Sequence, residues 1–138
     1  MVKTQKRIHC QGTTTIEAAL IFPLLLLLTF GVIEYGWLFL KAQQITNAAR
    51  HGARIAIRPD VESNQVLSYI NDLLTNAGIV PADCTIILSP TEVSSAAMGS
   101  AVNVYIKAQC ANMYIVNAAF LPKPTQIQAS VTMAKEGP

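Results

Sequence analysis

The 138-residue sequence has little of what most catalytic sites need. It contains two histidines and three cysteines, and it has no Walker loop, no Gly-x-Ser-x-Gly, no His-Glu-x-x-His and no Cys-x-x-Cys motif. A zinc site needs three or four ligands, whereas His51 stands alone among arginines. Asp60 and Glu62 begin a predicted helix, where acidic residues are favoured without any catalytic role. We therefore expect the chain not to be an enzyme, and we expect no metal or cofactor site.

Charge is also scarce. Asp, Glu, Lys and Arg together make up 13% of the residues, against 51% hydrophobic residues, and the formal net charge is +2. The positive charge is concentrated in residues 1–58, whereas residues 59–138 carry more acids than bases. The second part has no basic cluster of the kind that binds phosphate backbones. We therefore expect no nucleic-acid partner.

One long hydrophobic run dominates the N-terminal part. It is free of charge from Ala18 to Ile33, and it reaches bilayer length, about 34 Å as a helix, when it is extended to Leu40. Tyr35 and Trp37 near its end suit an interfacial belt. A secretory signal peptide is less favoured, because no small-residue cleavage site closes the run. Residues 18–40 are therefore predicted to cross a membrane, and the residues that mark the span are Ala18, Pro23, Leu24, Leu28, Ile33 and Leu40.

A glycine and a glutamate stand just before this run. A carboxylate at the centre of a membrane costs roughly 2.5–3.5 kcal/mol, so Glu17 needs a partner charge. A cut after Gly12 would supply one, because the new α-amine of Thr13 would lie about one helical turn away. The plainer alternatives are a loop glycine and a glutamate tolerated by the headgroup layer. Glu34, about 25 Å further along the helix, is interpreted as an interfacial glutamate near the opposite headgroup layer, with a functional partner as the alternative.

These residues resemble the cleavage site of prepilin-like proteins, in which a prepilin peptidase cuts after a glycine and a glutamate follows five residues later. Residues 18–28, AALIFPLLLLL, resemble the family's alanine, proline and polyleucine signature, and residues 47–56, NAARHGARIA, resemble its Ala/Arg-rich helix. Together they are similar to the TadE-like pseudopilins of tight-adherence (Flp) pilus systems. The resemblance is specific over residues 12–58. Beyond them it rests on element order and on the closing segment 129–136.

The resemblance implies a domain organisation and a set of partners. Residues 1–12 would be a cleaved leader, residues 13–58 a long helix that includes the span, and residues 59–138 a periplasmic head. The protein would cross the bacterial inner membrane once, with a cytoplasmic N-terminus, and could enter an extracellular pilus. As a minor pseudopilin in pilus assembly, it would meet the prepilin peptidase, the major Flp pilin, sibling minor pseudopilins, the inner-membrane assembly platform and membrane lipid.

Two alternative functions stay open at this point. A single-pass, membrane-tethered periplasmic binding module would keep Met1 and tolerate Glu17→Gln. A type II secretion-like pseudopilin would be favoured by a phenylalanine after Gly12, but Thr13 stands there instead.

The head is predicted to contain one helix and three strands. Apolar residues at helical spacing predict a helix over Val61–Ala77, with Asp60 as its N-cap and Gly78 at its end. The predicted strands are Thr85–Ser89, Ala101–Gln109 and Thr125–Ala134, of which the last two alternate apolar and polar residues. We therefore expect an α+β, pilin-like fold. A long N-terminal transmembrane helix packs on a small antiparallel sheet, together with a second amphipathic helix.

Two sets of residues recur every four positions on the long helix beyond the span. The basic set is interpreted mainly as a solvated face, with anionic headgroups or a neighbour's acids as the alternative partner. The small set permits close packing, either of helices in a membrane or, as we favour, against the protein's own sheet. The basic set is Arg50, Arg54 and Arg58, and the small set is Ala48, Gly52 and Ala56.

Cys84 and Cys110 are the two cysteines of the predicted head. Two is the right number for one disulfide in an oxidising compartment. The alternative is two separate buried thiols that behave as small apolar residues.

Overall fold

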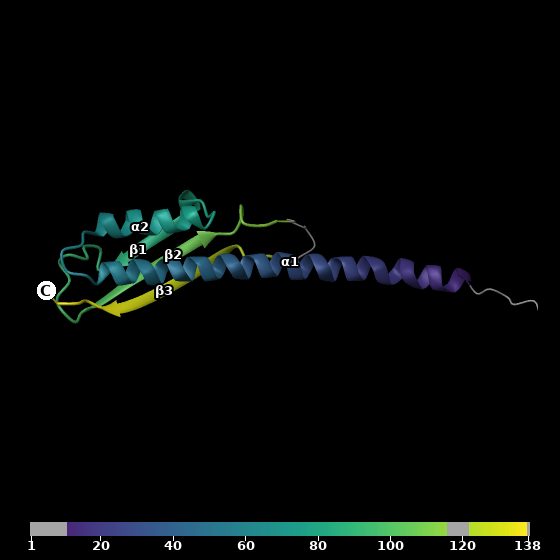
Figure 1. Cartoon of the computed structure of the whole chain (residues 1–138), viewed down its shortest axis with the longest axis horizontal. Coiled ribbons are helices and arrows are strands. Elements are labelled where there is room, and N and C mark those ends of the chain that lie inside the picture. Colours follow the sequence, from purple (N-terminus) through teal and green to yellow (C-terminus); the bar gives the residue numbers. More distant parts are fainter. Residues whose placement is uncertain (1–10, 116–121, 138) are drawn as a thin grey trace, which may run out of the picture. The chain divides into compact units, whose positions relative to one another are not determined.

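The computed structural model describes residues 11–115 and 122–137. Most of the predicted leader, residues 1–10, therefore lies outside the described residues. The chain divides into two units, Met1–Ile33 and Glu34–Pro138, and helix α1 runs through both of them. The elements in chain order are α1 (Gln11–Ala56), α2 (Ser63–Asn76), the short 3-10 helix η1 (Pro81–Asp83), β1 (Cys84–Ser89), β2 (Ala101–Gln109) and β3 (Gln126–Ala134) (Figure 1).

The described part of the first unit is the N-terminal stretch of α1. Its side chains are exposed from Thr14 to Phe30, although most of them are apolar. Among the described residues, α1 is the one helix long and apolar enough to cross a membrane, and its most apolar 18-residue window has a mean hydropathy of 2.4. The helix continues through Pro23, although proline removes one backbone hydrogen bond. An N-terminal helix of this kind is compatible with a single-pass membrane protein.

The head contains a three-stranded antiparallel sheet in the order β1-β2-β3. The register pairs Leu88 with Val104 and Val104 with Val131, so the inward side chains of the three strands lie in rows. The inward residues of the central strand β2 are fully buried, and they are Val102, Val104, Ile106 and Ala108. The predicted antiparallel sheet and the alternation of β2 are confirmed.

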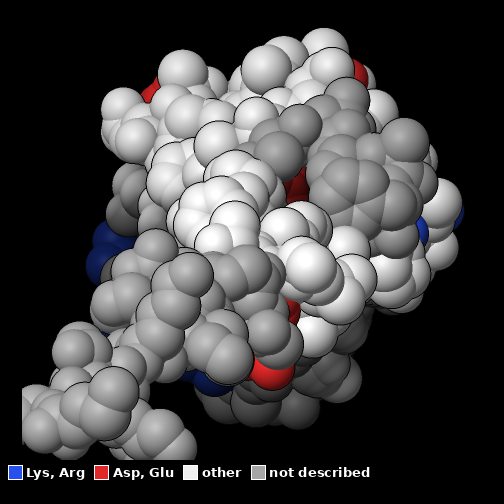
Figure 2. Space-filling view, turned by 90° about the vertical axis from the view of Figure 1, so that its right-hand side faces the viewer, with Lys and Arg blue, Asp and Glu red and all other residues white. Residues whose placement is uncertain are grey.

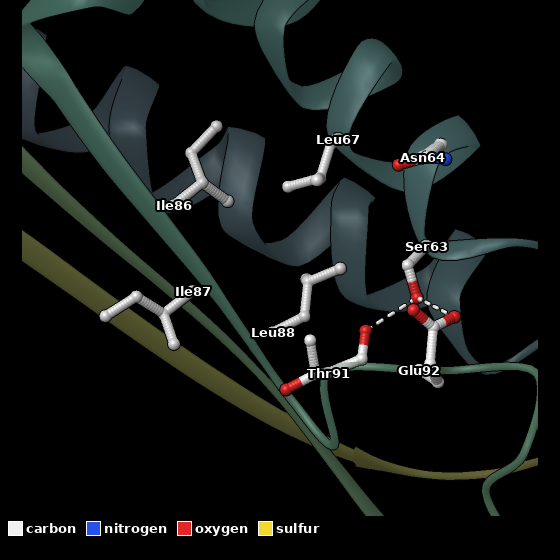
Figure 3. A pocket seen from close by; sticks show the side chains of 8 residues that line it. All are labelled: Ser63, Asn64, Leu67, Ile86, Ile87, Leu88, Thr91 and Glu92. Atoms are coloured by element: carbon white, nitrogen blue, oxygen red, sulfur yellow. Dashed lines mark hydrogen bonds between the residues drawn. The ribbon is translucent and has the colours of Figure 1, made fainter.

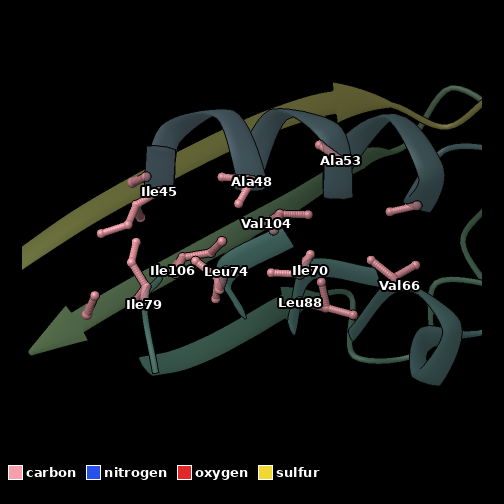
Figure 4. Close-up of a cluster of buried hydrophobic side chains, with 14 of the residues drawn as sticks. Ile45, Ala48, Ala53, Val66, Ile70, Leu74, Ile79, Leu88, Val104 and Ile106 are labelled. Atoms are coloured by element: carbon pink, nitrogen blue, oxygen red, sulfur yellow. The ribbon is translucent and has the colours of Figure 1, made fainter. Parts of the chain in front are cut away.

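The hydrophobic core lies between this sheet and the two helices. The second unit, Glu34–Pro138, is called the head from here on. The part of α1 that belongs to it and the helix α2 lie over one face of the sheet (Figures 1 and 4). The core side chains that are 0% exposed include Ile45, Ala49 and Ala53 from α1, and Val66, Ile70 and Leu74 from α2. Because both helices bury one apolar face, the head is a two-layer α+β structure. The fold is α+β and pilin-like, as the sequence predicted.

The start of α2 differs from the predicted N-cap. Asp60 has a positive φ of 60°, so it cannot adopt the extended conformation that an N-cap residue needs. Glu62, with φ −83° and ψ 149°, is the N-cap, and it forms a capping box with Gln65. Gly78 has φ 65°, a left-handed conformation that glycine adopts readily, and it follows the end of the helix as predicted.

Candidate functional site

The predicted processing segment lies at the beginning of α1. Gly12 and Thr13 belong to its first turn, and the Glu17 side chain is exposed. Helical spacing places Glu17 about one turn after Thr13. Cleavage after Gly12 stays a prediction. The residues that mark the predicted span, Ala18, Pro23, Leu24, Leu28, Ile33 and Leu40, are all exposed in the structure.

Glu34 corrects the interpretation of an interfacial glutamate. Its side chain is only 2% exposed, and its Oε1 accepts a hydrogen bond from the backbone N–H of Ile115 at 3.2 Å. The next residue, Tyr35, donates its hydroxyl hydrogen bond to the carbonyl of Pro122. Glu34 therefore joins α1 to the segment that follows β2, instead of facing headgroups. No local pattern predicts this contact, because 81 residues separate its two partners.

A buried lysine on α1 closes the C-terminal end of α2. Lys41 is 6% exposed, and its Nζ donates to the carbonyls of Ala77 at 2.6 Å and Gly78 at 3.3 Å. The same Nζ lies 4.8 Å from the centre of the Trp37 ring. The last carbonyls of a helix lack intrahelical partners and carry a partial negative charge. The ammonium group of Lys41 supplies these carbonyls with a hydrogen-bond donor, and its positive charge is favourable beside their partial negative charge.

A second buried lysine donates hydrogen bonds to backbone carbonyls at the C-terminal end of α1. Lys135, just after β3, is 7% exposed and donates to the carbonyls of Ala56 at 3.1 Å and Arg58 at 2.8 Å. The backbone N–H of Glu136 donates to the Ile57 carbonyl at 2.9 Å. The segment after β3 therefore fixes the end of the long helix. Sequence reasoning missed both lysine contacts, because each lysine lies far along the chain from the helix end that it caps.

The two periodic sets on α1 have different surroundings. Ala48 and Ala56 are buried, and a Cβ added at Gly52 would lie 2.5 Å from Cδ1 of Ile70. The small set therefore lies inside the head, but Gly52 lies closest to Ile70 of α2, and Val104 of the sheet is further away, at 3.8 Å. The arginines of the basic set, Arg50, Arg54 and Arg58, are exposed. Figure 2 shows charged side chains as small groups on a mainly uncharged face.

The predicted disulfide is not formed in this structure, where Cys84 and Cys110 are both free thiols. The register pairs Cys84 with Ala108, so Cys110 lies a diagonal step further along instead of opposite Cys84. Burial and the negative charge of Asp83 raise the pKa of the Cys84 thiol. Burial alone raises the pKa of Cys110. Both thiols therefore have a low thiolate fraction at neutral pH, and this lowers their reactivity.

A groove of 260 Å³ lies between α2 and the edge strand β1 (Figure 3). Leu67, Ile86 and Leu88 give it an apolar floor. At its polar end the Ser63 hydroxyl donates to the Thr91 carbonyl at 2.7 Å and accepts from the backbone N–H of Val93 at 3.0 Å. Because its floor is apolar, the groove suits an apolar side chain or peptide.

Among the described residues, no group of three or more His, Cys, Asp and Glu side chains could hold a metal ion.

Comparison with known protein families gives a match, and it lies within the long helix α1. Residues 12–54 match the family model described as TadE-like protein. The helix is TadE-like. The TadE-like match begins at Gly12 and includes Glu17, the apolar run and most of the Ala/Arg-rich segment, while α2 and the sheet lie beyond it. No curated protein and no solved structure shows a significant match to the chain. The TadE-like family indicates a role in tight-adherence pilus systems and an association with pilus machinery in general.

Proposed function

We propose that this chain is a minor pseudopilin that helps to assemble a Flp-type tight-adherence pilus, and that a prepilin peptidase cleaves it after Gly12. The observation that carries the proposal is the TadE-like match, which starts at this glycine and continues through the apolar helix. The folded head beyond the match suits a minor, priming or tip subunit. The role is structural, not enzymatic.

The proposed mechanism follows from the exposed apolar surface of α1. Before assembly the bilayer covers the side chains of residues 18–33, because that surface is costly to expose to water. During assembly, packing against the helices of neighbouring subunits replaces the lipid. Glu17 would then leave the headgroup layer, and a buried carboxylate without a partner charge is strongly destabilising. The α-amine of Thr13, in the same or a neighbouring subunit, would supply that charge and set the register.

The partners follow from this mechanism. The prepilin peptidase exposes the amine of Thr13. The major Flp pilin and the sibling minor pseudopilins cover the apolar helix. The inner-membrane platform accepts the chain from a membrane in which its N-terminus is cytoplasmic and its head is periplasmic.

The test uses a strain that lacks this gene and is complemented with variants of it. Glu17→Gln keeps the size of the side chain and removes its charge, so we expect a normal amount of membrane protein and a strong loss of pili in electron micrographs. The matched control is Asp72→Asn, which removes an exposed acid on α2 and should leave pili unchanged. Full pilus assembly by Glu17→Gln would favour the tethered binding module instead.

A further inference from the structure

The groove between α2 and β1 combines an apolar floor with a single carboxylate. The side chains of Leu67, Ile86 and Leu88 point into the space between the helix and the strand (Figure 3). Glu92 lies at the polar end, where its Oε2 is 3.4 Å from the Ser63 hydroxyl. None of the described residues that line the groove is basic. A ligand that fits the groove therefore has an apolar stem and a cationic end.

An arginine side chain has this form. The groove measures 260 Å³, which is below the range of about 300–1,000 Å³ that is usual for small-molecule sites, so it suits one side chain. The hydrocarbon stem of arginine packs on apolar surface while its charged end stays at the rim. Its guanidinium has five donors in one plane and can pair with a carboxylate through two parallel hydrogen bonds. Next to Glu92, the Asn64 amide and the Thr91 hydroxyl supply further acceptors.

The charges of the head are segregated along the chain. From residue 35 to residue 59 the sequence contains bases but no acid, and from residue 59 to residue 106 it contains acids but no base. Two of these acids, Asp60 and Glu62, come shortly before Ser63 in the chain, and both are exposed. Together with Glu92 they make the polar end of the groove acidic.

The bases that can reach such a groove are the arginines of the basic set. Lys41 and Lys135 are buried and hold helix ends, and Lys107 and Lys123 are half-buried. The arginines of the basic set are exposed. Their spacing places them on one face of α1 and just beyond its end. The chain therefore carries both a groove for an arginine and a row of arginines that project from the head.

We propose that the groove between α2 and β1 binds Arg54 of a second copy of this chain. Arg54 is the middle member of the basic set, and Arg50 lies about 6 Å before it on α1. With Arg54 in the groove, its neighbours in the basic set meet Asp60 and Glu62 of the other copy. The contact joins two different surfaces, so it is head-to-tail, and further copies can add.

The contact goes beyond the proposed function and does not rest on it. All of its residues lie in the head, Glu34–Pro138, so it needs neither cleavage after Gly12 nor the apolar stretch of α1. The experiment uses purified protein without a peptidase. Its failure would therefore leave the proposed function standing, and a chain that is never processed could still form the contact.

The test is sedimentation velocity of the full-length protein in detergent, with Arg54→Glu and Glu92→Arg as reciprocal charge reversals. Both side chains are exposed, so we expect both variants to fold, and circular dichroism checks this. The wild type should associate in a way that weakens as salt is added, because salt screens charge pairs. Each reversal places like charges together, so it should raise the dissociation constant about tenfold or more.

An equimolar mixture of the two variants shows whether the contact joins two copies. In the mixture, the reversed charge at position 54 of one variant meets the reversed charge at position 92 of the other. The unchanged Arg54 of the Glu92→Arg chain likewise meets the unchanged Glu92 of the Arg54→Glu chain. Mixing should therefore restore most of the lost affinity, whereas a contact within one chain cannot be restored in this way.

The matched controls are Asp72→Arg and Lys107→Glu. They make the same charge changes at positions that neither line the groove nor belong to the basic set, and they should leave the dissociation constant unchanged. The proposal is overturned by a wild type without salt-sensitive association, by a mixture that associates no better than its two components, or by equal losses in the controls.

A titration with acetyl-arginine amide, followed by nuclear magnetic resonance, identifies a different occupant. We expect the probe to shift the signals of residues that line the groove and to compete with self-association. Binding of the probe to a wild type that does not self-associate would assign the groove to an arginine of another protein, and it would overturn the second copy as the occupant.

Discussion

Gly52 of α1 faces Ile70 of α2 in the head. A Cβ added there would lie 2.5 Å from Cδ1 and 2.6 Å from Cγ1 of Ile70, and 3.8 Å from Cγ1 of Val104. Ile70 and Val104 are both 0% exposed, so neither can turn towards solvent to make room. Gly52→Ala therefore forces either a strained rotamer at Ile70 or a shift of α2.

Two effects of Gly52→Ala oppose each other. Alanine stabilises a helix interior over glycine by roughly 0.5–1 kcal/mol, whereas an extra methyl group in a filled core costs about 1–3 kcal/mol. We expect the overpacking to win and the free energy of unfolding of the head to fall by about 1 kcal/mol. For a domain of this size that lowers Tm by about 4–8 °C.

The assay is thermal unfolding of the full-length protein in detergent, followed by circular dichroism. Ile70→Ala removes both clashing atoms, so Gly52→Ala should become stabilising in that background. Gly36→Ala is the control on the same helix, because nothing lies within 4 Å of a Cβ added at Gly36. An equal loss of stability in both backgrounds, or a stabilising Gly52→Ala in the wild type, would refute the close contact.

Three further predictions concern polar groups of the head. Lys41→Met should lower the free energy of unfolding by about 1–2 kcal/mol, because it removes the charged donor from the end of α2. Amide hydrogen exchange should speed up in the last turn of α2 but not in β2. Unchanged exchange in the last turn of α2 would refute the capping role. Asp83→Asn should lower the raised pKa of Cys84 and so speed its alkylation at neutral pH, with Cys110 as the internal control; equal acceleration of both thiols would instead indicate a loosened fold. Glu34→Ala should speed exchange of the Ile115 amide, which loses its acceptor, and an unchanged rate would contradict the contact.

The elements with strong periodicity could be predicted from the sequence. The alternation in residues 101–109 indicated β2 with its observed bounds, because one side of that strand faces a core and the other does not. The uninterrupted apolar and Ala-rich stretch indicated one long helix. The four-residue spacing of Ala48, Gly52 and Ala56 indicated a helix face for close packing. That Ile70 would be the side chain packed against Gly52 could not be predicted.

The contacts that fix the head could not be predicted in the same way. Lys41 and Lys135 cap helix ends that lie 36 and 79 residues away in the chain, and no local pattern carries that information. Glu34 was predicted to be interfacial because it lies about 25 Å beyond Glu17 along the helix, whereas its contact with Ile115 comes from far along the chain. The N-cap of α2 could have been found, since Glu62 and Gln65 have the spacing of a capping box.

We propose that a prepilin peptidase processes this chain, whose residues 12–54 match the TadE-like family model, as a pseudopilin. The most direct test is the intact mass and N-terminal residue of the membrane-extracted protein, with and without its cognate prepilin peptidase. The account predicts a chain that starts at Thr13 only when the peptidase is present. A chain that still starts at Met1 in the presence of an active peptidase would contradict it, and so would a cut after Leu40.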